Sequence, residues 1–344
     1  MSNTNTSHTH PFKAFIMQLI ALVQRYPWVI ALFGFVSGTA SYFLVERSTQ
    51  LAQFLTILLL VSWMILLLEK GLRVRFFNRF GLEFPPTVMH YLTQLVHQES
   101  LFFTLPFFLA VTTWDHGQSV FTVLLMACAL VSVIDPLYYQ KLAKRRELFL
   151  MFHAFALFSM LVVALPIILQ LTTTESLAWA LLISLVLSLP SLAQVFQYQR
   201  WWRLPVLILL LTALAGTLWQ VRSWIPPASL RLTEISLSQE VDREKLSHSR
   251  DIERISASEL KRGLYAWTAV SAPRGLQDNI HHVWLQNGKE IDRITLEIEG
   301  GREEGYRAFS HKTKFPEDPV GRWQIRVITD SGQLIGLARF TVTD

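Results

Sequence analysis

The stretch LWQVRSWIPPASLRLTEISL, residues 218–237, divides the chain into two parts of different character. Before it, apolar runs follow one another, and each is about the 20 helical residues that cross a hydrocarbon core of roughly 30 Å. After it, the chain is charged and alternates apolar with polar residues, a pattern typical of half-buried strands. Trp224 suits a membrane interface, while Pro226 and Pro227 cannot continue a helix.

Upstream of this stretch, the apolar runs predict seven membrane spans, at 28–45, 51–68, 95–114, 120–139, 148–171, 177–196 and 204–221. The predicted fold class is therefore an α-helical transmembrane bundle of seven spans, followed by a C-terminal all-β, Ig-like antiparallel sandwich. Three domains are expected: a cytoplasmic tail with an interfacial amphipathic helix (1–27), the transmembrane domain (28–224) and a periplasmic β-sandwich (225–344).

The distribution of Lys and Arg predicts how the spans are oriented. Alternate connections hold twelve basic residues, and the connections between them hold two, Arg47 and Arg222. Because basic residues collect on the cytoplasmic side, the N-terminus is expected in the cytoplasm and the β domain in the periplasm of a bacterial inner membrane. Residues 1–228 carry fourteen basic and eight acidic side chains, and residues 229–344 carry seventeen and eighteen. The basicity is thus a topology signal and does not indicate a nucleic-acid partner.

Four ionisable residues within the predicted spans form a candidate polar site, namely His97, Glu99, Asp135 and His153. All lie at a similar depth near the cytoplasmic ends of their spans, and buried ionisable groups in membranes usually face a partner or a water-filled cavity. They could relay protons or bind a divalent metal; the alternatives are a structural polar network or snorkelling. His97 and Glu99 are two residues apart, so they cannot share one helix face.

Two small features of the predicted bundle have more than one interpretation. Gly34 and Gly38 form a small-xxx-small pair, which permits close helix packing either within the monomer or in a homodimer. The single cysteine, Cys128, lies in a predicted span, so the β domain owes nothing to disulfides. No sequence motif indicates a cofactor or a metal centre.

The strands of the tail are clearest around the turn Asn287-Gly288, which joins the predicted strands 280–286 and 289–298. Asn-Gly supplies the positive φ angles of a tight type I′ hairpin. A further strand pattern places Trp323, Ile325 and Val327 on one face and Arg322, Gln324 and Arg326 on the other. Trp284 and Trp323 are expected in the core.

The runs HVWLQNGK (282–289), YRAFSHKT (306–313), GRWQIRV (321–327) and GQLIG (332–336) resemble domain of unknown function 2914. This resemblance covers about 281–342 and implies an uncharacterised domain that typically ends polytopic membrane proteins of proteobacteria. The run HQESLFF (97–103) resembles the membrane region that accompanies the domain. The family implies an architecture, with no activity and no catalytic residues.

Four residues of those runs form a candidate ligand-binding patch on the β domain: His282, Arg307, His311 and Lys312. On adjacent strands they could present a cationic surface to an anionic envelope glycan, although a solvated strand face is the alternative. The leading hypothesis is a non-enzymatic inner-membrane protein whose β-sandwich binds an envelope component or a periplasmic protein. The alternative is a transporter or membrane enzyme that uses the polar layer, and a transmembrane sensor ranks third.

Overall fold

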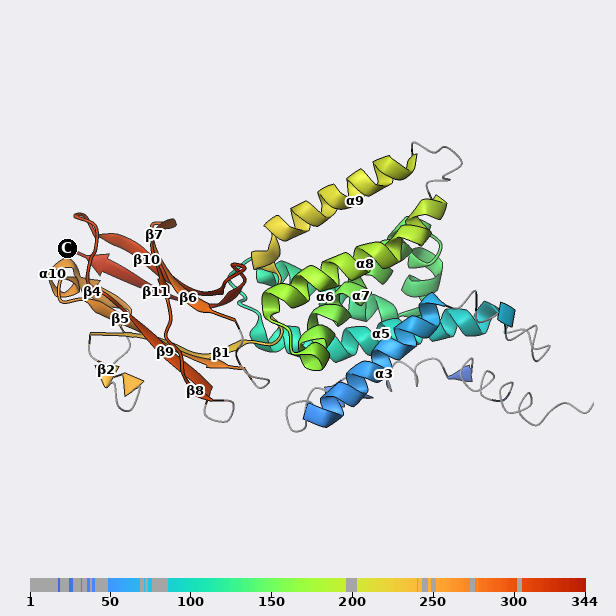
Figure 1. Ribbon diagram of the computed structural model, residues 1–344, viewed down its shortest axis with the longest axis horizontal. Helices are drawn as coiled ribbons and strands as arrows, with labels where there is room; N and C mark the ends of the chain where they lie inside the picture. The colour runs from blue at the N-terminus through green and yellow to red at the C-terminus, as the bar shows by residue number, and fades with distance from the viewer. Residues whose placement is uncertain are drawn as a thin grey trace, which may run out of the picture.

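The computed structural model describes residues 49–68, 86–195, 203–239, 241–242, 247–248, 252–272, 276, 278–301 and 305–344, with isolated residues before 86 (18, 25–26, 32, 36–37, 39–40, 71 and 74–75). Figure 1 shows an elongated molecule with the helices at one end and the strands at the other. The change from helix to strand falls where the composition changes, just after Trp224. Gly34, Gly38 and the predicted span 28–45 lie largely or wholly outside the described residues.

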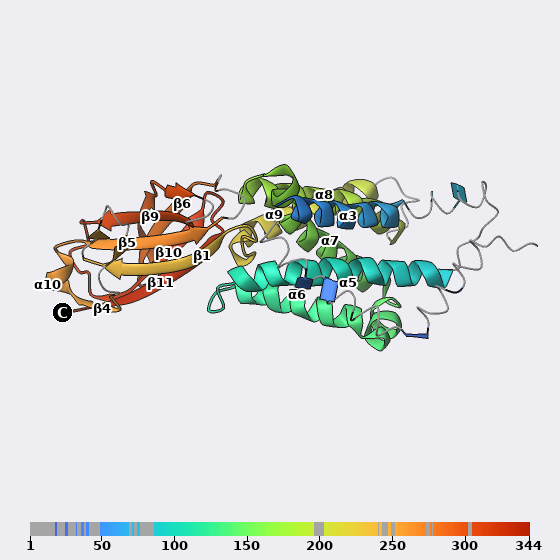
Figure 2. The same cartoon turned by 90° about the horizontal axis from the view of Figure 1, so that it is seen from below.

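The described helices of the first part are α3 (Thr49–Leu67), α5 (Pro86–Val111), α6 (Gln118–Val133), the π-helix η1 (Pro136–Leu142), α7 (Arg146–Leu169), α8 (Thr173–Val195), α9 (Arg203–Gln220) and the 3₁₀ turn η2 (Arg222–Trp224). Helix α7 is apolar on all sides and lies in the centre, where it contacts α3, α5 and α8 (Figure 2). Its segment from Ala156 to Ile167 is buried throughout. Helix α9 stands apart, and its main neighbour among the described long helices is α8 (Figure 1).

The fourth predicted span is broken in the structure. Helix α6 ends at Val133, Ile134 is extended, and η1 continues at 99° to α6. Pro136 fits the break, because proline has no N–H to donate to the carbonyl of Ser132 in the last turn of α6. The turn folds η1 back against the helices, so that Tyr138 is only 1% exposed. Such π-helical turns are frequent at functional sites.

The prediction of seven membrane-spanning helices is wrong. Among the described residues, α7 is the one helix long and apolar enough to cross a bilayer, and the bent pair of α6 and η1 would be a second. The apolar parts of the other helices are short, at Gln53–Leu66, Thr173–Ser188 and Ile208–Gln220. Helix α5 is long, but Gln94, His97, Gln98 and Glu99 make its first half polar. Apolar runs in the sequence therefore overestimated the lengths of the apolar helices.

The second part is β-rich, as the alternating pattern predicts. One sheet has the order β1-β5-β9-β8 and the other β4-β11-β10-β6-β7, and β2 and β3 form a small pair. The strands are β1 (Arg231–Ser238), β2 (Val241–Asp242), β3 (Ser247–His248), β4 (Arg254–Ser256), β5 (Leu264–Ser271), β6 (Ile280–Gln286), β7 (Lys289–Thr295), β8 (Glu299–Gly301), β9 (Gly305–Lys312), β10 (Gly321–Thr329) and β11 (Leu334–Thr343). A short helix, α10 (Ala257–Leu260), follows β4.

The two large sheets pack face to face. Their shared core contains Leu237 and Leu264 from the four-stranded sheet with Trp284, Trp323 and Phe340 from the five-stranded sheet. The predicted core positions of Trp284 and Trp323 are confirmed, since both are at most 1% exposed. The predicted hairpin is also present, with φ of 48° at Asn287 and 85° at Gly288. The sandwich is not wholly antiparallel as predicted, because β4 pairs with β11 in parallel.

The β part is docked on one end of the helical part. The segment that joins them, Ile225 to Ala228, is buried. The amide of Gln118 donates to the carbonyl of Leu334 at 2.6 Å, and that of Gln333 donates to the carbonyl of Ile225 at 3.1 Å. Buried side-chain hydrogen bonds of this kind fix the two parts, since leaving either group unpaired is costly.

Candidate functional site

One face of α5 carries the polar contacts of the helical part. Gln94, His97 and Gln98 are spaced i, i+3 and i+4, so they share the face that looks toward α6, η1 and α7. All three side chains are at most 5% exposed. The amides of Gln94 and Gln98 both donate to the carbonyl of Ser132, at 2.9 and 2.7 Å. This carbonyl lies in the last turn of α6, next to the break.

His97 is the centre of a buried hydrogen-bonded chain. Its Nδ1 lies 2.8 Å from the hydroxyl of Tyr138, and its Nε2 lies 2.9 Å from Nδ1 of His153. Trp63 and Phe152 pack against the His97 ring, with centroids 5.7 and 5.2 Å away. Two neutral tautomer patterns satisfy this chain, and conversion between them moves a proton from one end to the other. The sequence placed His97 and His153 at one depth, and the structure joins them directly.

Asp135 belongs to a neighbouring network. Its Oδ1 accepts from the Gln94 amide at 2.8 Å, and the Gln94 carbonyl accepts from the Tyr139 hydroxyl at 2.5 Å. Tyr138 and Tyr139 stand edge to face, with centroids 5.1 Å apart. Asp135 thus lies beside the histidine pair without a hydrogen bond to either imidazole among the described contacts.

Glu99 lies apart from the other three residues. Both of its carboxylate oxygens are 3.0 Å from the Ser37 hydroxyl, on the side of α5 away from His97. The separation follows from the two-residue spacing. The four predicted residues therefore do not converge: His97 meets His153, Asp135 is a neighbour, and Glu99 faces elsewhere. In the part of the chain that the structure describes, no group of three or more His, Cys, Asp and Glu side chains could hold a metal ion.

The predicted patch on the β part does not form, and His282 and Lys312 are the reason. The His282 side chain is fully buried between the sheets, where its ring nitrogens lie 2.8 Å from the Ser310 hydroxyl and 3.3 Å from that of Thr268. Burial lowers the pKa of His282 to about 3, so the imidazole is neutral. Lys312 is 4% exposed, and its ammonium donates to Asp292 at 2.5 Å. Both side chains belong to the interior.

Arg307 and His311 are on the opposite face of β9. The His311 ring stacks on Tyr265 with centroids 3.9 Å apart, and Arg307 is half-buried and opposite Ala269. Residues 306, 308, 310 and 312 face inward, so the alternation of the strand separates Arg307 and His311 from Lys312. The four predicted residues are thus divided: His282 and Lys312 point into the core, and Arg307 and His311 lie on the outer face of the four-stranded sheet.

A different cationic surface lies on the outer face of the five-stranded sheet. Directly paired residues share a face, and the pairing places five arginines there: Arg254, Arg293, Arg322, Arg326 and Arg339. We call this surface the arginine face. Arg293 pairs with Glu290 and Arg339 with Asp115 of the loop between α5 and α6. Among the described residues, Arg254 and Arg322 make no ion pair.

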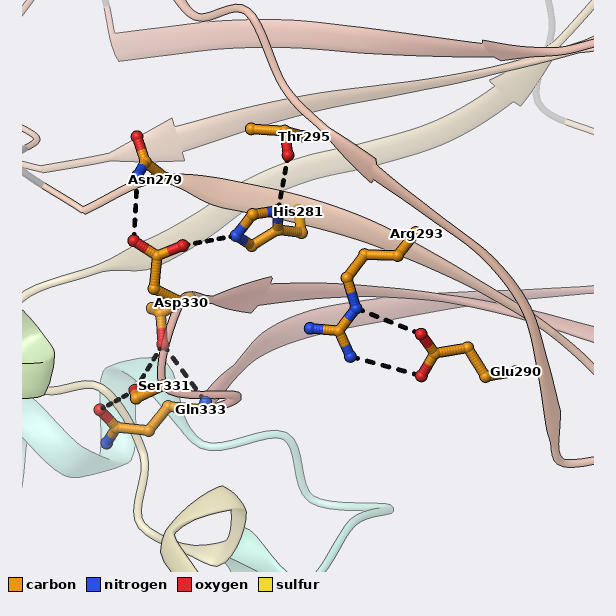
Figure 3. Close-up of polar contacts among 9 residues, drawn as sticks. Asn279, His281, Glu290, Arg293, Thr295, Asp330, Ser331 and Gln333 are labelled. Carbon is orange, nitrogen blue, oxygen red and sulfur yellow. Dashed lines mark hydrogen bonds and ion pairs between the residues drawn. The ribbon is translucent and has the colours of Figure 1, made fainter.

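One end of the arginine face holds an oriented histidine (Figure 3). His281 Nε2 lies 2.6 Å from Asp330 and Nδ1 lies 3.1 Å from the Thr295 hydroxyl. The hydrogen bond from His281 holds the pKa of Asp330 below its usual range. Sequence reasoning missed this surface, although the alternation of Arg322, Gln324 and Arg326 with apolar residues was visible. It did not show which strands lie beside β10.

Two family models match the chain. A protein of unknown function, DUF2914, matches residues 277–342, as the resemblance of that region implies. A family of unknown function, DUF5924, matches residues 9–266, which include all the described helices, the strands β1 to β4 and the first three residues of β5. No curated protein and no solved structure matches the chain. Since the second of these models covers well over half of the residues, the chain belongs to the DUF5924 family.

Proposed function

We propose that this protein is a non-enzymatic component of the bacterial inner membrane. Its helical part is inserted in the bilayer, its N-terminus is cytoplasmic, and its β part is held at the periplasmic surface. There the arginine face binds an anionic envelope component, such as a phosphate-bearing glycan. The observation that carries this proposal is the set of five arginines on one face of a sheet that is fixed to the helical part.

Exposed apolar side chains support insertion in a bilayer. Helices α3, α8 and α9 carry large hydrophobic residues that are 42–68% exposed: Phe54, Ile57, Leu58, Val61, Met64, Ile65, Trp179, Leu182, Val186, Val206, Ile208, Leu209, Leu210 and Leu214. Monomeric soluble proteins rarely expose contiguous apolar surface of this extent. A lipid environment removes the cost of exposing these apolar side chains to water, and the backbone groups of the helices are hydrogen-bonded within each helix.

The positions of the basic residues support the orientation. The connections between α5 and α6, between α7 and α8, and after α9 lie against the β part, and Arg222 is their one basic residue. The turn from η1 into α7 lies at the other end, and residues 141–146 carry Lys141, Lys144, Arg145 and Arg146. Basic loops favour the cytoplasmic side, so the β part is expected on the other side.

The chemistry of the arginine face supports an anionic ligand. Arg254 and Arg322 flank Thr341 in one row of the sheet, so their Cα atoms are about 10 Å apart at a strand spacing of ~4.8 Å. Guanidinium groups bind phosphate and carboxylate with two parallel hydrogen bonds. These two arginines lie at the end of the sheet away from the helical part, since the turn after the opposite end of β10 contacts Arg222 and Ile225.

The test measures binding of a phosphate-bearing lipopolysaccharide fragment to the full chain in zwitterionic nanodiscs. The double variant Arg254→Glu/Arg322→Glu is expected to bind about tenfold more weakly, which corresponds to about 1.4 kcal/mol. Binding is also expected to weaken with salt, because Arg254 and Arg322 are exposed. Arg262→Glu is the matched control, since Arg262 is an exposed arginine of the β part in the turn after α10. Equal loss in the control, or no loss in the double variant, would contradict the proposal.

A second candidate function is proton transfer within the helical part, and the Tyr138–His97–His153 chain favours it. An unbroken row of exchangeable groups can pass a proton by successive tautomer changes. In vesicles that contain a pH-sensitive dye, the full chain would speed pH equilibration and His153→Asn would abolish the effect. If pH equilibrated at equal rates with and without the protein, the Tyr138–His97–His153 hydrogen bonds would serve only as a structural contact between α5, η1 and α7.

A further inference from the structure

Among the described residues, the Glu99 carboxyl group is surrounded mainly by apolar side chains. It lies in the middle of α5 and is partly buried, and its one described partner is the hydroxyl of Ser37. The described residues place no Lys, Arg or His within ion-pair distance of it. A single hydroxyl compensates a carboxylate poorly, because burial of an ion without an opposite charge is expensive. Intramembrane acids without a partner of this kind generally serve a ligand or an ion.

Glu99 opens into a groove between α3 and α5. The groove has a volume of about 440 Å³ and is lined by apolar side chains of both helices, including Leu55, Leu59, Leu92 and Phe103. Ser37 and Ser62 are its other polar side chains among the described lining, and Glu99 is its one acid there. The volume lies in the range of pockets that hold small organic molecules. One negative charge in an apolar groove selects strongly for the charge of the occupant.

We propose that this groove binds an organic cation with an apolar body, and that the positive charge is held by Glu99. The site is separate from the arginine face and goes beyond the function proposed above. A phospholipid fits the groove less well, because its phosphate would meet Glu99 and no basic side chain of the described lining. An uncharged acyl chain would fill the apolar space but leave Glu99 uncompensated. The ligand reaches the site from the bilayer, where amphiphilic cations concentrate.

The experiment measures binding of tetraphenylphosphonium to the full chain in nanodiscs of a zwitterionic lipid, by equilibrium dialysis. Saturable binding of one cation per chain is expected. Glu99→Gln keeps the size of the side chain and removes its charge, so it is expected to weaken binding at least tenfold. Tetraphenylborate has the same shape and the opposite charge, and it is expected not to bind.

Two further variants separate loss of the site from loss of the fold. Leu92→Trp narrows the groove and leaves residue 99 a glutamate, and it is also expected to weaken binding at least tenfold. Glu147→Gln changes an exposed carboxylate at the start of α7, and it is expected to bind like the wild type. Absence of saturable binding to the wild type would overturn the proposal, as would equal binding by Glu99→Gln or equal binding of tetraphenylborate.

Discussion

His282 shows how a titratable residue can be part of the core. Its neutral ring bridges the two sheets through the Ser310 and Thr268 hydroxyls. The pKa is about 3 in the folded protein and 6.5 in the unfolded reference, so the unfolded chain binds one more proton between these values. By linkage, the contribution of His282 to stability is complete above pH 6.5 and is lost as the pH falls toward 3. We expect acid to destabilise the β part through this residue.

The pH dependence is measured by thermal unfolding of the full chain between pH 7.5 and 4. His282→Gln can keep both hydrogen bonds but cannot gain a proton. Its unfolding temperature is therefore expected to fall less steeply with acid than that of the wild type. Parallel curves for the two proteins would show that His282 does not titrate on unfolding.

Trp323 is expected to contribute strongly to the stability of the β part. Its ring is 1% exposed, stacks on Phe340, and donates from Nε1 to the carbonyl of Pro319 at 2.8 Å. Trp323→Ala is expected to cost about 3–5 kcal/mol, because the cavity between the sheets cannot close. Chemical denaturation, followed by the circular dichroism signal of β structure, checks this value.

The control for this prediction is Trp114→Ala, since Trp114 is 53% exposed in the loop between α5 and α6. Exposed substitutions usually change stability by less than about 0.5 kcal/mol. If Trp323→Ala cost less than about 1 kcal/mol, the ring could not be part of a packed core.

The alternation of apolar and polar residues predicted that the two tryptophans lie in the core, but not that His282 and Lys312 lie there as well. On β6, Ile280, His282 and Trp284 face inward, yet Val283 and Leu285 on the outer face are also buried. Because both faces carry apolar residues, the sequence pattern does not tell which one holds His282. Lys312 ends β9 with an inward direction, and its length lets it reach Asp292 of β7. That contact depends on the pairing of strands, which the sequence does not reveal.

The break between α6 and η1 is a feature that could have been predicted from the sequence. Asp135-Pro136 is a strong signal for a helix end, but the apolar run continues on both sides and suggested one span. The bend brings Tyr138 to His97, so the hydrogen-bonded chain depends on it. Shared depth made a pairing of His97 with His153 possible. It did not predict the tyrosine, because only the bend places it there.

Gly117 is the N-cap residue of α6 and lies at a close contact between elements. A Cβ atom at this position would lie 2.7 Å from the Trp224 ring of η2. Gly117→Ala must therefore displace the ring or α6, and overpacking of this kind typically costs about 1–3 kcal/mol. A lower unfolding temperature and a changed tryptophan fluorescence of the full chain are the expected results.

Gly216→Ala is the matched control, because nothing lies within 4 Å of a Cβ atom there and Gly216 is inside α9. Alanine favours a helix by about 1 kcal/mol over glycine, so this variant is expected to be neutral or more stable. Equal destabilisation by both substitutions would show that the contact with Trp224 is not the cause.

The two family models do not coincide with the two structural parts. The DUF5924 match ends at residue 266, inside β5, while the helical part ends at Trp224. The sheet β1-β5-β9-β8 therefore combines strands from both matches. Composition placed the change from helix to strand correctly, because it responds to burial and strand alternation. It could not predict the docking of the β part, which depends on single polar residues of loops that have no periodicity.

Asp278 is one of these docking residues, and it is the most informative one to change. It precedes β6, is 9% exposed, and accepts from both the backbone N–H and the hydroxyl of Thr173 at the start of α8. Burial raises the pKa of its carboxyl, and the two hydrogen bonds from Thr173 act in the opposite direction. Asp278→Ala would leave a helix N-terminal N–H unpaired in a buried place, at a cost of about 1–3 kcal/mol.

Asp278→Ala destabilises the junction between the two parts. We therefore expect the β part to stay folded but to be held less firmly against the helical part. The buried linker Ile225–Ala228 should become accessible, so limited proteolysis of the full chain should cleave near it faster than in the wild type. Asp278→Asn keeps one acceptor for the Thr173 N–H. Its linker should therefore be cleaved at a rate between those of the wild type and Asp278→Ala. Asp344→Ala, which removes an exposed carboxylate at the far end of β11, should behave like the wild type. If Asp278→Ala left cleavage of the linker unchanged, the junction would be held by its other contacts, among which the hydrogen bonds of Gln118 and Gln333 would be the next to test.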